Sequence, residues 1–221
     1  QLEFSFSEKA VEWIKQILAQ KFDNQIAVLL TIQPIDNSEL QKKFTATIHK
    51  INDYKNKVLH IKGEIVSDVA PNLRGWEGVA SKYYFDCISS ILPEAYQFKE
   101  RSQHPATDIF NCLLNYGYGV LYGKIESALI KAGIDPYIGI MHRDDYNRPV
   151  LVYDIIELYR IWIDFIVIHL CRQNAITHEA FSIKDDGSYW LEALGKRILI
   201  QSINDYFDEI ILLNGLSRSR A

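Results

Sequence analysis

The stretch Asp108–Gly133, DIFNCLLNYGYGVLYGKIESALIKAG, decides the fold. Asp108 suits the N-cap position because its carboxylate can accept hydrogen bonds from the free N–H groups of a first helical turn. Gly133 is placed as the C-terminal stop. Between them, apolar residues recur at helical spacing: Phe110, Leu113, Leu114, Leu121, Ile125, Ala128 and Leu129. The stretch therefore predicts one long helix.

Three glycines inside this helix, Gly117, Gly119 and Gly123, do not form a phosphate-binding loop, because such loops lie between a strand and a helix. We interpret them as positions where a neighbouring element packs closely against the helix. A protein nucleophile is not supported either, since the sequence has no Gly-x-Ser-x-Gly turn and no cysteine–histidine motif.

Helical spacing continues on both sides of this stretch. Ser5 followed by Glu8 has the spacing of a capping box, and Pro34 ends the helix that follows. Other segments with a helical period are about 40–51, 76–91, 151–170 and 189–213. Residues 52–73 show no clear period, and Val58–Val66 is compatible with a strand or a helix. The predicted fold class is mainly α.

Composition narrows the class of protein. The chain has 221 residues, 48% of them hydrophobic, which excludes disorder as the default. Its formal charge of −4 excludes a global basic field for nucleic acid. Three cysteines far apart (Cys87, Cys112 and Cys171) form no disulfide framework and predict a reducing, cytoplasmic compartment. No apolar run reaches the roughly 18 residues of a membrane span, and no signal peptide is expected.

Acidic residues on apolar helices are the most informative feature. Asp154 and Glu157 are three residues apart on the predicted helix 151–170, and Asp164 follows on the same face. On the helix 108–133, polar residues form one line: Asn111, Asn115, Tyr118, Tyr122 and Glu126. His142 lies in the loop that joins the two helices. Buried carboxylates need a partner, and carboxylates with one imidazole suit manganese or magnesium.

The pattern also has simpler interpretations. Asp154 and Glu157 could pair with Arg160 along their own helix. The line of asparagines and tyrosines could be a solvated face, and His142 could be an ordinary hydrogen-bonding histidine. From pattern alone, a helical domain with a metal site and one without it both stay open.

Several motifs, in one order, carry a resemblance to a known family. They are the stretch Thr107–Tyr118 with Leu121 and Glu126, then Ala132–Pro136, Gly139–His142, Asp154–Arg160 with Asp164, Gly75–Ala80 with Tyr83 and Phe85, Phe98 with Arg101, and Lys21 with Asn24 and Gln25. Together they resemble the CRISPR-associated integrase and endonuclease family, Cas1. The resemblance covers nearly the whole chain.

The resemblance implies a fold and a domain organisation. The family has an N-terminal β-domain followed by a helical catalytic domain, and this chain resembles the helical domain. We therefore expect the β-domain to be missing from the chain or supplied elsewhere, through truncation or through fusion to a longer protein such as a reverse transcriptase. The implied helical integrase domain, residues 1–221, divides into N-terminal helices with the less legible segment (1–73), catalytic helices (74–214) and a basic tail (215–221).

The resemblance also assigns residues. The metal ligands for Mn²⁺ or Mg²⁺ are Glu126, His142 and Glu157, and Asp154 supports them from beside the metal. The implied reaction is transesterification, in which the 3′-hydroxyl of a DNA fragment attacks a CRISPR repeat, so no protein nucleophile is needed. With water in place of the hydroxyl, the same site would act as a DNA endonuclease. Alternatives are a general metal-dependent phosphodiesterase and a non-catalytic helical scaffold.

The implied partners are nucleic acid and protein. They are double-stranded DNA with 3′ overhangs, CRISPR repeat DNA, a small ferredoxin-like Cas subunit and, with the β-domain present, a second copy of the chain. Basic residues expected to contact DNA phosphates are Arg101, Arg143, Arg148, Lys196 and Arg197, with Arg218 and Arg220 of the tail. Each could instead be an exposed solubilising cation.

Overall fold

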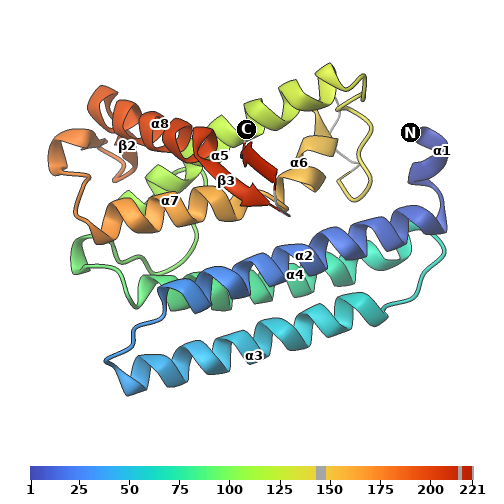
Figure 1. The fold of residues 1–221 in the computed structure, drawn as a ribbon, viewed down its shortest axis with the longest axis horizontal. Coiled ribbons are helices and arrows are strands. Elements are labelled where there is room, and N and C mark those ends of the chain that lie inside the picture. Colours follow the sequence, from blue (N-terminus) through green and yellow to red (C-terminus); the bar gives the residue numbers. More distant parts are fainter. Residues whose placement is uncertain (143–147, 214–215, 221) are drawn as a thin grey trace. The chain divides into compact units, whose positions relative to one another are not determined.

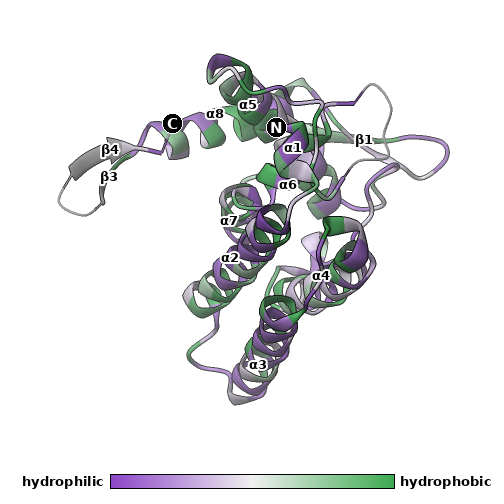
Figure 2. Cartoon of the chain, turned by 90° about the vertical axis from the view of Figure 1, so that its right-hand side faces the viewer, coloured by the Kyte–Doolittle hydropathy of each residue, from purple (hydrophilic) through white to green (hydrophobic). Residues whose placement is uncertain are grey.

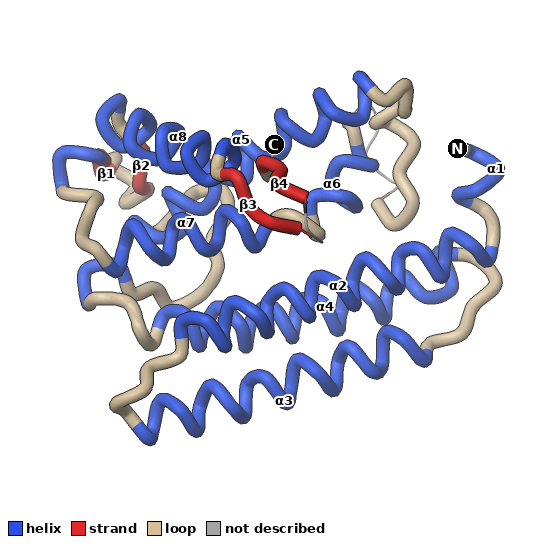
Figure 3. Tube along the Cα trace, viewed as in Figure 1, coloured by secondary structure: helices blue, strands red, loops and turns tan. Residues whose placement is uncertain are grey.

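A computed structural model describes residues 1–142, 148–213 and 216–220. The fold is mainly α, as predicted, and the strands are few and short (Figure 3). The α-helices are α1 (Leu2–Ser5), α2 (Glu8–Ile32), α3 (Ser38–His60), α4 (Val66–Ser89), α5 (Ile109–Lys131), α6 (Val150–Ile156), α7 (Arg160–Arg172) and α8 (Ala193–Asp208). Over the described residues, no helix is long and apolar enough to cross a membrane.

The remaining elements are single-turn helices and two hairpins. The 3₁₀ turns are η1 (Glu94–Tyr96) and η2 (His178–Ala180). Strand β1 (Phe181–Ile183) pairs antiparallel with β2 (Tyr189–Leu191), and β3 (Ile210–Leu213) pairs antiparallel with β4 (Leu216–Ser219).

The chain forms two compact units. The first comprises residues 1–91 and 121–161, and the second comprises residues 92–120 and 162–221. Helix α5 contributes to both. Residue 73, the expected limit between the N-terminal helices and the catalytic helices, lies inside α4.

Helices α2, α3 and α4 of the first unit lie side by side, with α3 antiparallel to the other two (Figure 1). Their shared core consists of fully buried apolar side chains: Ile14, Leu18, Phe22, Phe44, Ile51, Leu73 and Tyr84. Lys55 of α3 pairs with Asp23 of α2 at 2.6 Å. Hydrophilic residues cover much of α3 (Figure 2), so the buried stripe of this helix provides most of its attachment.

Both predicted ends of α5 are confirmed. The Asp108 carboxylate accepts a hydrogen bond from the backbone N–H of Asn111 at 2.7 Å. Gly133 adopts a φ of +71°, where a side chain would be strained. The N–H of Ile134 donates to the carbonyl of Leu129 at 2.9 Å, as in a Schellman motif.

The glycines of α5 differ from one another. A Cβ on Gly117 would lie 2.5 Å from Cγ2 of Ile163 on α7, so the predicted close packing is confirmed there. A Cβ on Gly119 or Gly123 would meet nothing within 4 Å, so the same prediction is wrong for these two. Both lie on the exposed surface of α5.

Two predictions near the N-terminus are wrong. Ser5 lies in α1, where its hydroxyl donates to the carbonyl of Leu2, and it does not form a capping box with Glu8. Helix α4 begins at Val66, ten residues before the expected start, and contains Pro71. The proline removes one helical hydrogen bond, and the buried Val66 and Leu73 compensate by packing in the core. Val58–Val66 is the end of α3, a short loop and the start of α4.

The expected helix over residues 189–213 is confirmed only in its middle. Residues 189–191 form β2, α8 covers Ala193–Asp208, and residues 210–213 form β3. At Tyr189 the backbone N–H donates to the carbonyl of Ala106, which is distant in the sequence, and not to a carbonyl four residues back. Helical periodicity in the sequence does not reveal such a partner.

The three cysteines are free and buried. Burial raises the pKa of the Cys87 and Cys112 thiols to about 11 and that of Cys171 to about 12. The cytoplasmic location inferred from cysteine usage stays a prediction.

We therefore predict that none of the three thiols reacts with Ellman's reagent in the native protein at pH 8. At that pH the thiolate fraction of each is at most about one part in a thousand, and access is blocked as well. All three should react in denaturant. Rapid reaction of any one thiol in the folded protein would contradict the burial described above.

Candidate functional site

A break between α6 and α7 organises the site. The sequence predicted one continuous helix through residues 151–170, and this prediction is wrong: α6 ends at Ile156 and α7 begins at Arg160. In the break, the N–H groups of Leu158 and Tyr159 donate to carbonyls three residues back instead of four. The amide of Asn24 on α2 donates to the carbonyl of Leu158 at 2.9 Å, which satisfies an acceptor outside both helices.

Glu157, the first residue of this break, is buried between two cations. Nζ of Lys21 lies 2.5 Å from its Oε2, and Nε of Arg160 lies 2.8 Å from its Oε1. Lys21 also pairs with Glu77 of α4, which accepts a hydrogen bond from the Ser81 hydroxyl. We name Lys21, Glu77, Glu157 and Arg160 the ionic cluster.

The charges of the ionic cluster shift its pKa values. Burial alone would raise the pKa of Glu157, but Arg160 and Lys21 outweigh it and lower the pKa to about 2. Burial alone would lower the pKa of Lys21, but Glu157 and Glu77 raise it above its ordinary value. Both groups are therefore ionised at neutral pH, although their exposed fractions are only 9% and 6%.

Asp154 is fully buried one turn before Glu157, and its carboxylate has three donors. The backbone N–H groups of Ile140 and Met141 donate to Oδ2 at 2.7 and 3.1 Å. Nδ1–H of His142 donates to Oδ1 at 2.7 Å. Asp154 thus holds residues 140–142 of the loop after α5 against α6 and fixes the orientation of the imidazole.

The hydrogen bond from His142 to Asp154 raises the pKa of the imidazole above its ordinary value. Burial opposes this shift, and the charge of Glu157 reinforces it. Because Nδ1 is engaged, Nε2 is the ring nitrogen that remains for a ligand or a proton.

Glu126 lies on α5, one turn after Tyr122, and is half-buried. Burial raises the pKa of Tyr122, and the charge of Glu126 contributes to the shift. The Tyr122 ring packs against Tyr153 of α6 at 5.3 Å between centroids, and Tyr153 lies 6.0 Å from the His142 ring. Two aromatic rings therefore connect the helix of Glu126 to the imidazole.

Glu126, His142 and Glu157, the three predicted metal ligands, do not form a ready metal site. Within the described ranges, no three histidine, cysteine, aspartate or glutamate side chains form a group that could hold a metal ion. The donor chemistry nevertheless fits a hard cation: His142 is oriented by a buried carboxylate, and Glu157 is an ionised buried carboxylate. Both oxygens of Glu157 are engaged by cations of the protein. The metal-ligand assignment of Glu126, His142 and Glu157 stays a prediction.

The simpler interpretations are partly confirmed. Glu157 pairs with Arg160 along the chain, whereas Asp154 pairs with His142. The polar line on α5 is not a solvated face, because Asn111 is fully buried and its amide donates to the carbonyl of Glu100. Tyr118 donates to Asp164 on α7.

Arg101, which was predicted to contact DNA, forms hydrogen bonds with other residues of the second unit. Its guanidinium donates to the side-chain oxygens of Asn111 and Asn115 and lies 5.8 Å from the centre of the Tyr118 ring. These bonds attach the segment before α5 to the polar line of that helix. They give Arg101 a structural role beside any contact with phosphate.

The other predicted DNA contacts are dispersed. Arg148 is exposed in the first unit, and Lys196 and Arg197 are exposed on α8 in the second. Arg220 pairs with Glu209 and lies over the Tyr206 ring at 4.0 Å. Arg143 lies outside the described residues, and nothing is described of the Arg218 side chain.

Sequence reasoning assigned no role to Lys21, Asn24, Glu77 or Tyr153. Lys21 and Asn24 are three residues apart, so they share one face of α2, and a lysine facing an apolar core signals a buried ion pair. No comparable signal exists for Tyr153, because its contacts come from α5 and from the loop after it.

Comparison with known proteins gives the family. The profile of the CRISPR associated protein Cas1 family matches residues 1–205. The chain belongs to the Cas1 family. A CRISPR-associated endonuclease Cas1 of Archaeoglobus fulgidus is 31% identical over 211 residues, which are 91% of this chain and 61% of the relative. A second, from Methanospirillum hungatei, is 30% identical over 86% of this chain and 55% of the relative. The chain thus spans little more than half of these relatives.

Solved structures agree on the Cas1 fold. A chain of a Cas6-RT-Cas1–Cas2 complex matches with a TM-score of 0.82 and 26% identity, over 95% of this chain and 22% of that chain. A casposase bound to integration product matches with a TM-score of 0.82 and 23% identity, over 99% and 62%. A Cas1 protein from Thermotoga maritima matches at 0.74 and 23%, over 92% and 60%. The last two likenesses show the fold alone.

The hydrogen bond between Asp154 and His142 predicts a pH dependence. Since the pKa of His142 is raised above the unfolded value of 6.5, the bond stabilises the fold below that pH, and this stabilisation is lost as the pH rises through the folded pKa. In Asp154→Asn the imidazole should titrate at lower pH, because burial then dominates. The free energy of unfolding should fall by about 1.5–3 kcal/mol.

NMR titration of the imidazole and urea denaturation measure these two effects. Asp53→Asn, on the exposed face of α3, is the matched control and should change stability by at most about 0.5 kcal/mol. An unchanged His142 midpoint in Asp154→Asn would remove the assigned role of this carboxylate.

Proposed function

We propose that this chain is the helical part of an integrase of CRISPR adaptation. It joins the 3′-hydroxyl of a DNA fragment to a CRISPR repeat by transesterification, and it cleaves DNA when water replaces the hydroxyl. The observation that carries the proposal is the buried pair of Asp154 and His142 beside the ionised Glu157, in a chain of the Cas1 family.

The residues of the chain prepare the site for this reaction. Asp154 keeps the proton of the imidazole on Nδ1, so Nε2 presents a lone pair. Glu126, His142 and Glu157 would hold Mn²⁺ or Mg²⁺. A bound cation would supply acidification of the attacking hydroxyl and stabilisation of charge on the phosphate. The nucleophile belongs to the DNA, in agreement with the lack of a nucleophile motif in the sequence.

The partners follow from the same proposal. The substrates are double-stranded DNA with 3′ overhangs and repeat DNA, with Arg148, Lys196 and Arg197 among the phosphate contacts. A small ferredoxin-like Cas subunit provides further DNA surface, supported by the Cas1–Cas2 complex in which a similar chain occurs. That complex also supports fusion to a reverse transcriptase in a longer protein. A homodimer forms when the β-domain is present.

Two other functions make different predictions. A general phosphodiesterase with the same ligands would shorten DNA or RNA and would give no joined strands. A helical scaffold would do neither. Product length on a denaturing gel separates the three, because only an integrase lengthens the labelled DNA fragment, by the part of the target strand that follows the broken phosphodiester.

Substitution of the ligands tests the proposal directly. We expect Glu126→Ala, His142→Ala and Glu157→Gln each to lower strand joining by more than about 100-fold, since a cation is held poorly after loss of a ligand. Asp154→Ala should lower it by about 10–100-fold, as is usual for residues that orient a ligand. The assay contains the small Cas subunit and Mn²⁺.

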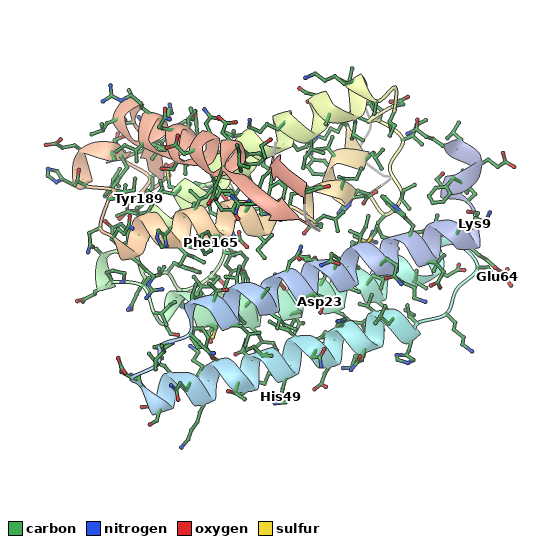
Figure 4. The ribbon with its side chains drawn as sticks, in the orientation of Figure 1. Lys9, Asp23, His49, Glu64, Phe165 and Tyr189 are labelled. Atoms are coloured by element: carbon green, nitrogen blue, oxygen red, sulfur yellow. The ribbon has the colours of Figure 1, made fainter. Side chains whose placement is uncertain are left out.

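Matched controls lie on exposed surfaces of the first unit. Glu64→Ala and His49→Ala replace the same residue types (Figure 4) and should join DNA at the wild-type rate. Joining at the wild-type rate by all three ligand variants would refute the assignment.

A further inference from the structure

In the ionic cluster each oxygen of Glu157 faces a cation, but only Oε1 accepts a hydrogen bond, and Oε2 is buried with an ion-pair contact alone. Arg160 engages Oε1 at 2.8 Å and Lys21 engages Oε2 at 2.5 Å. A divalent cation approaching Glu157 would therefore meet a positive charge of the protein at each oxygen. Because Lys21 and Glu157 are buried, water screens this repulsion little.

Lys21 has a second carboxylate within reach. Its ammonium already contacts Glu77, so it can leave Glu157 and keep one ion pair. A lysine suits such an exchange because its ammonium is a compact charge on a flexible stem, with three donors. The Ser81 hydroxyl holds the Glu77 carboxylate by a hydrogen bond at 3.1 Å.

The backbone around Glu157 does not depend on Lys21 alone. Asn24, on the same face of α2, donates to the Leu158 carbonyl and connects α2 to the break between α6 and α7. Release of Glu157 by Lys21 therefore leaves this connection in place.

We propose that Lys21 is a two-position counterion for Glu157: it pairs with both Glu157 and Glu77 in the structure, and it would keep only Glu77 if a divalent cation were held by Glu157. Lys21 is thus a positioning residue for a metal ligand. The inference rests on the cation site of the proposed function.

Two substitutions test the exchange with effects of opposite sign. Lys21→Met removes the competing charge from Oε2, so we expect Mn²⁺ to bind about tenfold more tightly or better, by the order of magnitude of a close charge pair. Glu77→Gln removes the second position, so Lys21 stays on Glu157 and Mn²⁺ should bind about tenfold more weakly. Isothermal titration of the whole chain with MnCl₂ measures both affinities without any DNA.

Lys15→Met is the matched control. Lys15 lies on α2, is as buried as Lys21 and pairs with Glu12, which is outside the ionic cluster. Its substitution should leave the Mn²⁺ affinity unchanged. A purely structural role of Lys21 would weaken binding in both cluster variants, so it would not give the opposite signs. Circular dichroism checks that each variant folds, and if Lys21→Met does not fold, Glu77→Gln decides alone.

Each outcome has one meaning. Tighter binding by Lys21→Met together with weaker binding by Glu77→Gln supports the exchange. Unchanged or weaker binding by Lys21→Met, or unchanged or tighter binding by Glu77→Gln, overturns it. If Glu157→Gln abolishes Mn²⁺ binding in that case, the proposed cation site survives and only the exchange fails. If neither the wild type nor Lys21→Met binds Mn²⁺, the exchange and the cation site both fail.

Discussion

The buried carboxylate of Glu157 is the constraint to which the rest of the site responds. An isolated charge at 9% exposure would be costly, and two cations from separate parts of the chain offset that cost. The arrangement requires α2, α4 and the break after α6 to meet at one point. Removing one partner of such a buried ion pair typically lowers the free energy of unfolding by about 3–5 kcal/mol. The ionic cluster therefore stabilises the fold in addition to positioning Glu157.

Asp154, one turn before Glu157, is also a buried carboxylate, but different groups offset the free energy of its burial. Two of its three donors are neutral backbone N–H groups, and the third is the imidazole of His142. The pH ranges of the two carboxylates differ accordingly. The stabilisation from Glu157 is present above its ordinary pKa and is lost only as the pH falls toward about 2, whereas that from His142 on Asp154 is lost on the alkaline side.

The sequence was most informative where the determinant is local. The ends of α5 depend on Asp108 and Gly133, which act on groups within five residues of themselves, and both were predicted correctly. Ser5 and Glu8 also have the spacing of a capping box, but no such box forms because Ser5 is part of α1. The glycines of α5 show the limit clearly: identical residues in one helix pack closely or not at all, depending on whether α7 lies opposite.

By itself the sequence determined the helical class, the caps of α5 and the resemblance to Cas1. These depend on periodicity, on short-range hydrogen bonding and on motifs read in order. Only the tertiary structure decided that the helix after the loop breaks at Glu157, that Asp154 and not Glu157 holds the histidine, and that Lys21 is the counterion. Each of these contacts joins residues from different elements, up to 136 positions apart in the sequence (157 − 21), and no local pattern records which side chains the packing of α2 brings to α6.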